Sequence, residues 1–506
     1  RGNVMPNEHI LHLENGKFAS QSGLEVLQDW FTNASNTQNE AGWVFHFHGG
    51  LVSEQDGRRI AAKLTPHYET AGAYPLFFVW ESGLLEVIQN NAQEIFKEKL
   101  LKETVKKVGD WVARKLPSGL GLKGNGNSLI KSNELHKELD DWLYERTSSD
   151  QSKLPQIYVV EDNPEVTKSA LLVQDELTMS TQIEISIQQD LKFKEAYAAV
   201  YNGLHKPTLH SVSKGSGSSV SEQSLISMDA AEKIFDLAPY GTKGVLSWYK
   251  VAKFIAGLVV RVVKRFITGR DHGVYITVVE EVLRGLYADK LGKFIWDTMK
   301  QDTADAFKED MHCGGYALIK MLKAKMDNDG SLPVITLVGH STGAIYIRHF
   351  IESATKQIDN IKFNIIFLAA AETYKSFAPF VQAHKQSITN FRAFAMTDNW
   401  EKADTLVKVL YPASLLYFIS GVLEDEIDQP LIGMQRYYSE PLFQNSSTFN
   451  YITTVKVFMD NVQSSLVWSP IDTVDGNRSN SASHGEFDDD LLTVSSLKHI
   501  LMRGYI

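Results

Sequence analysis

A serine stands between two glycines in the segment 333–347, which reads PVITLVGHSTGAIYI. Apolar, β-favouring residues precede GHSTG at 339–343, and a helical spacing of apolar residues follows directly. Such a turn strains the serine backbone and lifts the hydroxyl off the sheet, while side chains at Gly339 or Gly343 would collide with neighbouring backbone. The amino end of the next helix also stabilises nearby negative charge. The pattern predicts Ser341 as a nucleophile, with an ordinary strand-to-helix turn as the alternative.

An anion site for this nucleophile is predicted upstream, in HFHGGL at 46–51. Two glycines after a strand let backbone N–H groups come close to a developing oxyanion. The amides of Gly50 and Thr342 are the predicted donors, with Gly49 or Leu51 as neighbours able to substitute. A plain glycine turn at a strand end is the alternative.

The same strand carries His46 and His48, whose H-x-H spacing suits a metal clamp. A structural zinc site needs four protein ligands and a catalytic one needs three. No third ligand is evident, so we expect no metal. A glycine-rich stretch at 119–127 lacks a preceding strand and a Gly-Lys-Ser/Thr ending, so we expect no phosphate loop and no organic cofactor.

Together, His-Gly-Gly after one strand and Gly-His-Ser-Thr-Gly after a later one resemble the α/β-hydrolase superfamily, in its serine esterase and lipase branch. The resemblance covers residues 43–82 and the chain from 333 onward. It implies the order nucleophile, acid, histidine along the chain, with the acid after the penultimate core strand and the histidine after the last.

The residues beyond the tight turn at 339–343, called the elbow below, fit that order. FRAFAMTDNWEKAD at 391–404 places Asp398 just beyond a strand, with Glu401 and Asp404 as close rivals; a solvated acidic loop is the alternative. SSLVWS at 464–469 is expected to be the last strand, and His484 lies in the polar loop after it. This histidine is the predicted base, although a loop histidine can also be merely exposed.

The pattern of strands and helices predicts an α/β fold with a mostly parallel sheet covered on both faces. We expect residues 1–83 and 331–506 to form the two parts of a hydrolase core. Residues 84–330 are expected to be a large, mainly helical insertion with a flexible Ser/Gly-rich segment near 211–224.

The composition of the chain limits the classes of partner and the cellular compartment that we expect. The net charge of −10 argues against a phosphate-neutralising surface, so nucleic acid is not expected. One cysteine, Cys313, rules out an intrachain disulfide and fits a reducing compartment. The first ten residues lack an apolar signal core, and the chain lacks an apolar run of ~20 residues. We expect a soluble, cytoplasmic protein whose oligomeric state the sequence leaves open.

The insertion contains a helical pattern at 248–270 with a basic stripe and an apolar remainder. One interpretation is a cap helix that packs on the core. The alternative is a mobile lid that transiently contacts a membrane surface or lines an acyl pocket. Asp271 and His272 stand side by side in the insertion, and we expect a structural turn there.

These observations predict a serine hydrolase that cleaves an ester, with a lipid or other apolar ester favoured, without a cofactor. Ser341 would attack, His484 would transfer the proton, and Asp398 would hold the imidazole. Thioesterase, amidase and peptidase activities share this chemistry and remain open. An alternative of another class is a binding or signalling module on a hydrolase scaffold, with an idle triad.

Overall fold

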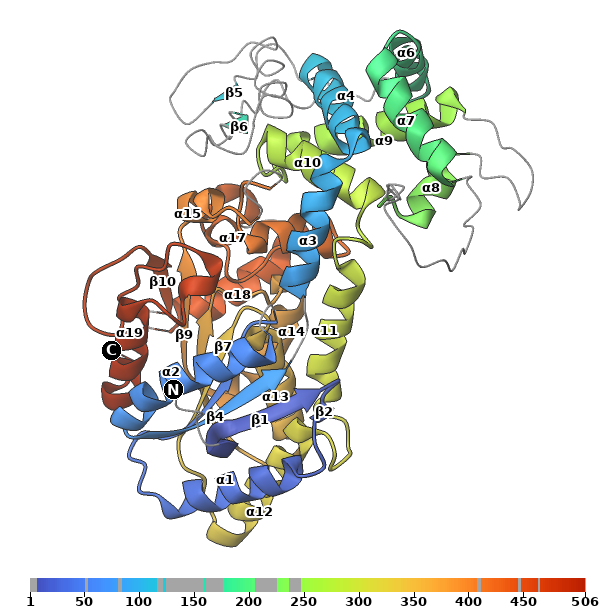
Figure 1. Cartoon of the computed structure of the whole chain (residues 1–506). Coiled ribbons are helices and arrows are strands. Elements are labelled where there is room, and N and C mark those ends of the chain that lie inside the picture. Colours follow the sequence, from blue (N-terminus) through green and yellow to red (C-terminus); the bar gives the residue numbers. More distant parts are fainter. Residues whose placement is uncertain are drawn as a thin grey trace, which may run out of the picture.

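The computed structural model describes residues 7–50, 53–80, 84–115, 122–123, 159–160, 176–204, 225–235, 247–406, 411–444, 447–462 and 465–505. An eight-stranded sheet forms the centre of the described fold, and helices cover both of its faces (Figure 1). The protein is therefore α/β, as the alternation of strand and helix patterns predicted. Two short strands, β5 (Leu122–Lys123) and β6 (Val159–Val160), form a separate antiparallel pair.

The main sheet has a topological switch point at its middle, where the chain runs from two adjacent parallel strands toward opposite edges of the sheet. Its strands are β1 (Ile10–Glu14), β2 (Lys17–Phe18), β3 (Gly42–Phe47), β4 (Ala73–Trp80), β7 (Ile335–His340), β8 (Phe363–Leu368), β9 (Ile388–Met396) and β10 (Leu466–Ser469). Their order is β10-β9-β8-β7-β3-β4-β1-β2, and within the described residues every neighbouring pair is parallel except β1 with β2. From the adjacent strands β3 and β7 the chain runs to opposite edges of the sheet. Loops at the carboxyl ends of two such strands diverge, which is where α/β proteins bind ligands.

Strand residues are apolar on both faces because helices cover both. Successive side chains of a strand point to opposite sides, so Val44 and Val338 join one core while Phe45 and Leu337 join the other. The first core also contains apolar residues of α2 (Glu54–Thr70) and α19 (Leu491–Arg503). The second contains α1 (Gly23–Asn36), α12 (Gly314–Asp329), α13 (Gly343–Gln357), α14 (Tyr374–His384) and α18 (Asn450–Asp460).

The chain between β4 and β7 is mainly helical where it is described. Its helices are α3 (Leu84–Lys97), α4 (Lys99–Lys115), α6 (Glu176–Gln188), α7 (Leu191–Leu204), α8 (Met228–Ile234), α9 (Trp248–Ile267), α10 (Val274–Leu286) and α11 (Lys293–Asp305). Helices α4 and α6 to α10 gather at one end of the molecule, and α3 and α11 connect that group to the sheet (Figure 1). The described apolar side of α9 is buried: Val251, Ile255, Leu258 and Val262 are inaccessible to solvent. In this conformation the helix packs inside the protein, and membrane contact through it stays a prediction.

The turn between α9 and α10 is fastened to the carboxy-terminal part of the chain by buried ions. His272 Nδ1 lies 2.7 Å from Glu280 Oε1, and its Nε2 lies 2.8 Å from Asp428 Oδ1. Both ring nitrogens therefore contact carboxylate oxygens, one from α10 and one from the segment that contains Asp428. Arg265 Nη2 adds a contact of 2.6 Å to Glu280 Oε2. Asp271 and His272 thus lie in a turn, and the histidine joins the insertion to the core.

Short elements complete the carboxy-terminal part. They are α15 (Asp398–Ala403), α16 (Leu415–Phe418), the π-helical turn η4 (Ile419–Leu423) and α17 (Gln435–Ser439), with 3-10 turns η1 (Asn7–His9), η3 (Lys385–Ser387), η5 (Pro441–Phe443), η6 (Ser447–Phe449) and η7 (His484–Glu486).

The predicted strands correspond to β3, β4 and β7 to β10, whereas β1, β2, β5 and β6 were not predicted. The Ser/Gly-rich segment near 211–224 lies outside the described residues. None of the helices in the described ranges combines the length and apolar character that crossing a lipid bilayer requires.

Candidate active site

Ser341 occupies the tight turn between β7 and α13, and its backbone is strained as the sequence predicted. Its φ angle is +53°, in the left-handed region, which costs a residue with a side chain roughly 1–2 kcal/mol. A Cβ atom at Gly339 would lie 2.7 Å from the Gly343 carbonyl group, and one at Gly343 would overlap the Phe47 carbonyl oxygen. Both glycines are therefore required by close backbone approach.

Neighbouring strands fix the Ser341 backbone and leave its hydroxyl free. The Ser341 N–H donates to the Leu368 carbonyl at 2.8 Å, and its carbonyl accepts from the Ala371 N–H at 3.0 Å. The side chain is buried, with the residue 2% exposed, and within the described residues Oγ has no hydrogen-bond partner. The site presents a held hydroxyl with its bonding capacity unused.

The residues predicted to form the anion site lie together beside Ser341. A Cβ atom at Gly49 would lie 3.3 Å from Ser341 Cβ, and the Gly50 N–H donates to Thr342 Oγ1 at 2.5 Å. The Thr342 N–H makes no hydrogen bond within the described part of the chain. One predicted donor is thus free and the other is bonded to a hydroxyl; Leu51 lies outside the described residues.

His484 begins the short turn η7 after β10 and lies next to the elbow. Its carbonyl accepts from His340 Nε2 at 2.9 Å, and the two imidazole ring centres are 5.4 Å apart. The ring is buried, and among the described residues neither nitrogen has a hydrogen-bond partner. The structure therefore places His484 beside His340, the residue before Ser341. The side chains of His484 and Ser341 are not hydrogen-bonded to each other.

A buried ion pair ties the elbow to the histidine loop. His340 Nδ1 lies 2.9 Å from Asp488 Oδ2, while its Nε2 donates to the His484 carbonyl. Since a carbonyl oxygen only accepts, both His340 nitrogens carry protons and the ring is an imidazolium paired with the carboxylate. Burial alone lowers the pKa of His340, but Asp488 outweighs it and raises that pKa. The pKa of Asp488 falls to about 2 because His340 outweighs its burial.

The same environment keeps His484 neutral. Burial is the main cause that lowers the pKa of His484 well below its ordinary value, and the positive charge of His340 lowers it further. A neutral imidazole is the form that accepts a proton from a serine hydroxyl. Near neutral pH the His484 ring is therefore uncharged.

The three candidate acids have different partners. Asp398 accepts from the Tyr417 hydroxyl at 2.5 Å and pairs with Lys402 Nζ at 2.6 Å, which lowers its pKa despite burial. Glu401 is bonded to Ser414, and burial raises its pKa well above the usual range. Asp404 Oδ2 accepts from the His484 backbone N–H at 2.9 Å. Of the three, Asp404 is the carboxylate that contacts the histidine residue, and Asp398 does not orient its ring here.

His46 and His48 are bonded within the protein. His46 Nδ1 lies 3.0 Å from the Tyr68 hydroxyl, and His48 Nε2 accepts from the Trp80 N–H at 3.1 Å. Burial lowers the pKa of both rings to about 4. The described residues contain no group of three or more His, Cys, Asp or Glu side chains that could hold a metal ion.

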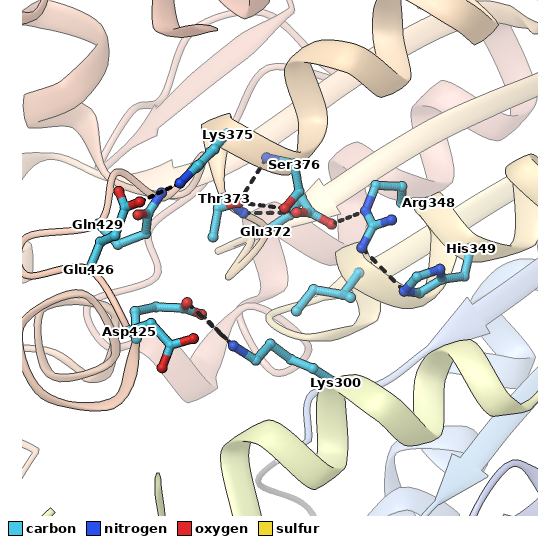
Figure 2. A pocket seen from close by; sticks show the side chains of 12 residues that line it. Lys300, Arg348, His349, Glu372, Thr373, Lys375, Ser376, Asp425, Glu426 and Gln429 are labelled. Carbon is cyan, nitrogen blue, oxygen red and sulfur yellow. Dashed lines mark hydrogen bonds and ion pairs between the residues drawn. The ribbon is translucent and has the colours of Figure 1, made fainter. Parts of the chain in front are cut away.

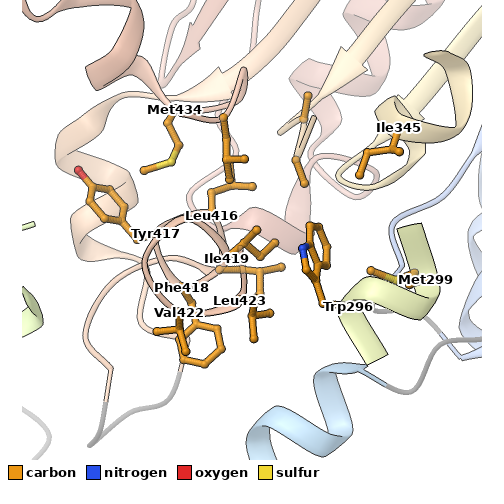
Figure 3. Packing of buried hydrophobic residues seen from close by; sticks show 14 of the residues in the cluster. Trp296, Met299, Ile345, Leu416, Tyr417, Phe418, Ile419, Val422, Leu423 and Met434 are labelled. Atoms are coloured by element: carbon orange, nitrogen blue, oxygen red, sulfur yellow. The ribbon is translucent and has the colours of Figure 1, made fainter. Parts of the chain in front are cut away.

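An apolar layer from the insertion and the carboxy-terminal part lies over the elbow. Met299 of α11 places its sulfur where a Cβ at Gly50 would stand. Trp296 and Met299 face Ile345 of α13 and the apolar side chains of α16 and η4, which include Leu416, Ile419 and Leu423 (Figure 3). Met299 thus brings this apolar layer next to Gly50, whose N–H contacts Thr342.

A polar pocket of about 270 Å³ lies one helical turn away, between α11, α13, the start of α14 and residues 424–429 (Figure 2). Its charges are mutually paired: Arg348 Nε lies 2.8 Å from Glu372 Oε2, Lys300 Nζ lies 3.2 Å from Glu424 Oε1, and Lys375 contacts Glu426. Ser341 is not among its lining residues. The Lys300–Glu424 pair in this pocket connects α11 to the segment 424–429, and the pocket is separate from the Ser341 turn.

Sequence reasoning did not assign roles to His340 and Asp488, nor to Met299. His340 stood inside the elbow pattern and Asp488 four residues after the predicted base, which was a usable signal. Nothing in the sequence marked Met299. Comparison with family models, curated proteins and solved structures found no match to this chain.

Proposed function

We propose that the protein is a serine hydrolase of the α/β-hydrolase type that cleaves esters by acyl transfer to water. The observation that carries the proposal is the left-handed Ser341 between two glycines that no larger residue can replace. Backbone strain of this kind is retained where the surroundings enforce it, typically at functional sites. The position of the turn beside the β3–β7 switch point supports the same proposal.

In this mechanism Ser341 Oγ attacks the ester carbonyl while His484 takes its proton. A tetrahedral intermediate forms, the carbon–oxygen bond to the alcohol breaks, and His484 returns the proton to the leaving alcohol. Water then repeats the sequence on the acyl-enzyme. We assign the orienting carboxylate to Asp404 in place of Asp398, since Asp404 is already bonded to the His484 backbone. The mechanism requires the His484 ring to rotate so that Nδ1 donates to Asp404 and Nε2 faces Ser341, since neither nitrogen has a partner among the described residues.

The favoured substrate is an ester with an apolar acyl group. The layer over the elbow, drawn in Figure 3, is made of buried apolar side chains. A substrate that enters there exchanges contact with water for contact with these side chains, which gains roughly 25 cal/mol per Å² of apolar surface. Met299 must move for entry, because its sulfur fills the space beside Gly50.

The test is covalent labelling with a fluorophosphonate probe. Wild type should be labelled, Ser341→Ala should not, and Ser353→Ala, a substitution on the same helix α13, should keep the label. A panel of short esters, triglycerides, phospholipids and thioesters, with detergent present to favour opening, then defines the substrate. Labelling of Ser341→Ala at the wild-type rate would refute the assignment.

A catalytically idle binding module is the second candidate. The unbonded ring nitrogens of His484 and the buried Oγ of Ser341 favour it, since no proton path joins them in this conformation. A folded wild-type protein that reacts with neither probe nor esters, with or without detergent, would support the module and reject the hydrolase.

A further inference from the structure

The side chain of Thr342 has a hydrogen-bond donor without a partner. A hydroxyl offers one proton and two lone pairs. The Gly50 N–H occupies one lone pair of Thr342 Oγ1 at 2.5 Å, and the described residues provide no acceptor for the hydroxyl proton. Thr342 is 1% exposed. A buried donor left unpaired opposes folding, so this group is suited to an acceptor that arrives with a ligand.

The location of the donor points to that acceptor. Thr342 directly follows Ser341, and in an elbow the N–H of this residue faces the oxygen of an acyl group on the serine. The Thr342 N–H is also unbonded within the described part of the chain. Two donors on one residue, the N–H and the Oγ1–H, can therefore point to the same oxygen.

Gly50 then acts behind Thr342 rather than on the substrate. An N–H group that donates to a hydroxyl oxygen polarises that hydroxyl and strengthens it as a donor. Gly50 has no room for a side chain, because a Cβ there would lie 2.7 Å from Thr342 Oγ1 and would overlap the Met299 sulfur. The glycine thus permits the close approach that the bond requires.

We infer that the Thr342 hydroxyl is a direct donor to the oxyanion, and that the Gly50 amide orients and polarises it. The inference rests on the proposed function, since it concerns the tetrahedral intermediate formed on Ser341. It replaces the backbone pair predicted from the sequence by two donors from one residue.

The test compares Thr342→Val, which keeps the shape and loses the hydroxyl, with Thr342→Ser, which keeps the hydroxyl. Steady-state hydrolysis of p-nitrophenyl butyrate and the rate of fluorophosphonate labelling are measured with the melting temperature of each variant. Loss of one oxyanion donor typically lowers kcat by ~10²–10³-fold. We expect that loss in Thr342→Val, with KM changed much less, and recovery of most of the lost kcat in Thr342→Ser, which retains the hydroxyl.

Thr342→Ala is a third variant, included in case valine prevents folding. Its smaller side chain leaves room for a water molecule to pair with the Gly50 N–H. It should lose at least ~10-fold in kcat at an unchanged melting temperature. A folded Val or Ala variant as fast as wild type, or faster, would overturn the inference and show that the hydroxyl only fills the oxyanion position at rest. A wild-type protein inert to both reagents would instead reject the proposed function, and the inference with it.

Discussion

Replacing Ser341 by alanine should make the protein more stable, although most substitutions of buried residues destabilise. The hydroxyl is buried and lacks a hydrogen-bond partner among the described residues. Alanine removes this group and keeps the Cβ atom and the backbone. If the serine is held for chemistry, its removal abolishes labelling and raises the free energy of unfolding at the same time.

The magnitude follows from two local costs. A buried hydroxyl without a partner costs roughly 1–3 kcal/mol, so Ser341→Ala should gain at least ~1 kcal/mol. Ser341→Gly also relieves the φ of +53°, worth roughly 1–2 kcal/mol. Glycine gives back roughly 0.5–1 kcal/mol through the entropy of the unfolded chain. We therefore expect the glycine variant to be at least as stable as the alanine variant.

Ser414→Ala is the matched control, because Ser414 is also a fully buried serine but its hydroxyl is used. It contacts Glu401, and it accepts from the Tyr417 N–H at 3.3 Å as the N-cap of α16. Loss of such a cap costs roughly 0.5–2 kcal/mol, and the buried Glu401 loses a partner as well. The two Ser→Ala changes should thus have opposite signs.

The assay combines urea unfolding with hydrogen exchange of peptides that cover β7 and the start of α13. A chain of 506 residues can unfold in more than one step, and exchange in these peptides reports the opening of the elbow itself. Slower exchange in Ser341→Ala, and faster exchange near α16 in Ser414→Ala, are the expected results. A Ser341→Ala protein less stable than wild type by ~1 kcal/mol or more would refute the reasoning about strain and the free hydroxyl.

Three further predictions test the surroundings of the site. Asp404→Asn should lower kcat strongly while Asp398→Asn changes it little, since only Asp404 bonds the His484 residue; equal effects in ester hydrolysis would contradict the assignment. Burial lowers the pKa of His48 to about 4, so its contribution to stability is complete above pH ~6.5 and is lost as the pH falls towards 4, by about 3 kcal/mol. His48→Gln should reduce the difference in unfolding free energy between urea melts at pH 7 and at pH 4.5. An unchanged difference would show that His48 does not cause the loss of stability in acid. His272→Gln breaks a buried ion cluster and should cost roughly 3–5 kcal/mol, whereas Asp271→Asn should stay within ~1 kcal/mol; similar melting temperatures for both would refute the proposed attachment of the insertion.

The sequence predicted the fold where patterns are long and unambiguous. Apolar, β-favouring runs such as VITLVG at 334–339 and FNIIFLAAA at 363–371 indicate buried strands, and β7 and β8 form there. β1 was not predicted because it carries polar residues such as His12, and β2 because it has two residues and lies at the edge of the sheet. The contacts of the insertion could not be predicted, since they depend on pairs such as His272 with Asp428 that lie far apart in the chain.

The elbow was predictable because its physics is local. A left-handed serine flanked by glycines is dictated by five consecutive residues, and the structure has that geometry. The choice of acid was not local: Asp398, Glu401 and Asp404 all follow β9, and only the packing of Lys402, Tyr417 and Ser414 against the first two distinguishes them.

The unbonded groups around the elbow belong together. Ser341 Oγ, the His484 ring nitrogens and the Thr342 N–H and hydroxyl proton are all buried within the described structure without partners. Each such group opposes folding by an amount comparable to a lost hydrogen bond. The bonds of Ser341 to Leu368 and Ala371, and the His340–Asp488 pair, keep the groups in place regardless. In the proposed mechanism an ester would give these groups partners, because its carbonyl oxygen would accept from Thr342 while the serine proton moves to His484. Those bonds would strengthen as negative charge develops on that oxygen, so they would stabilise the transition state more than the bound ester.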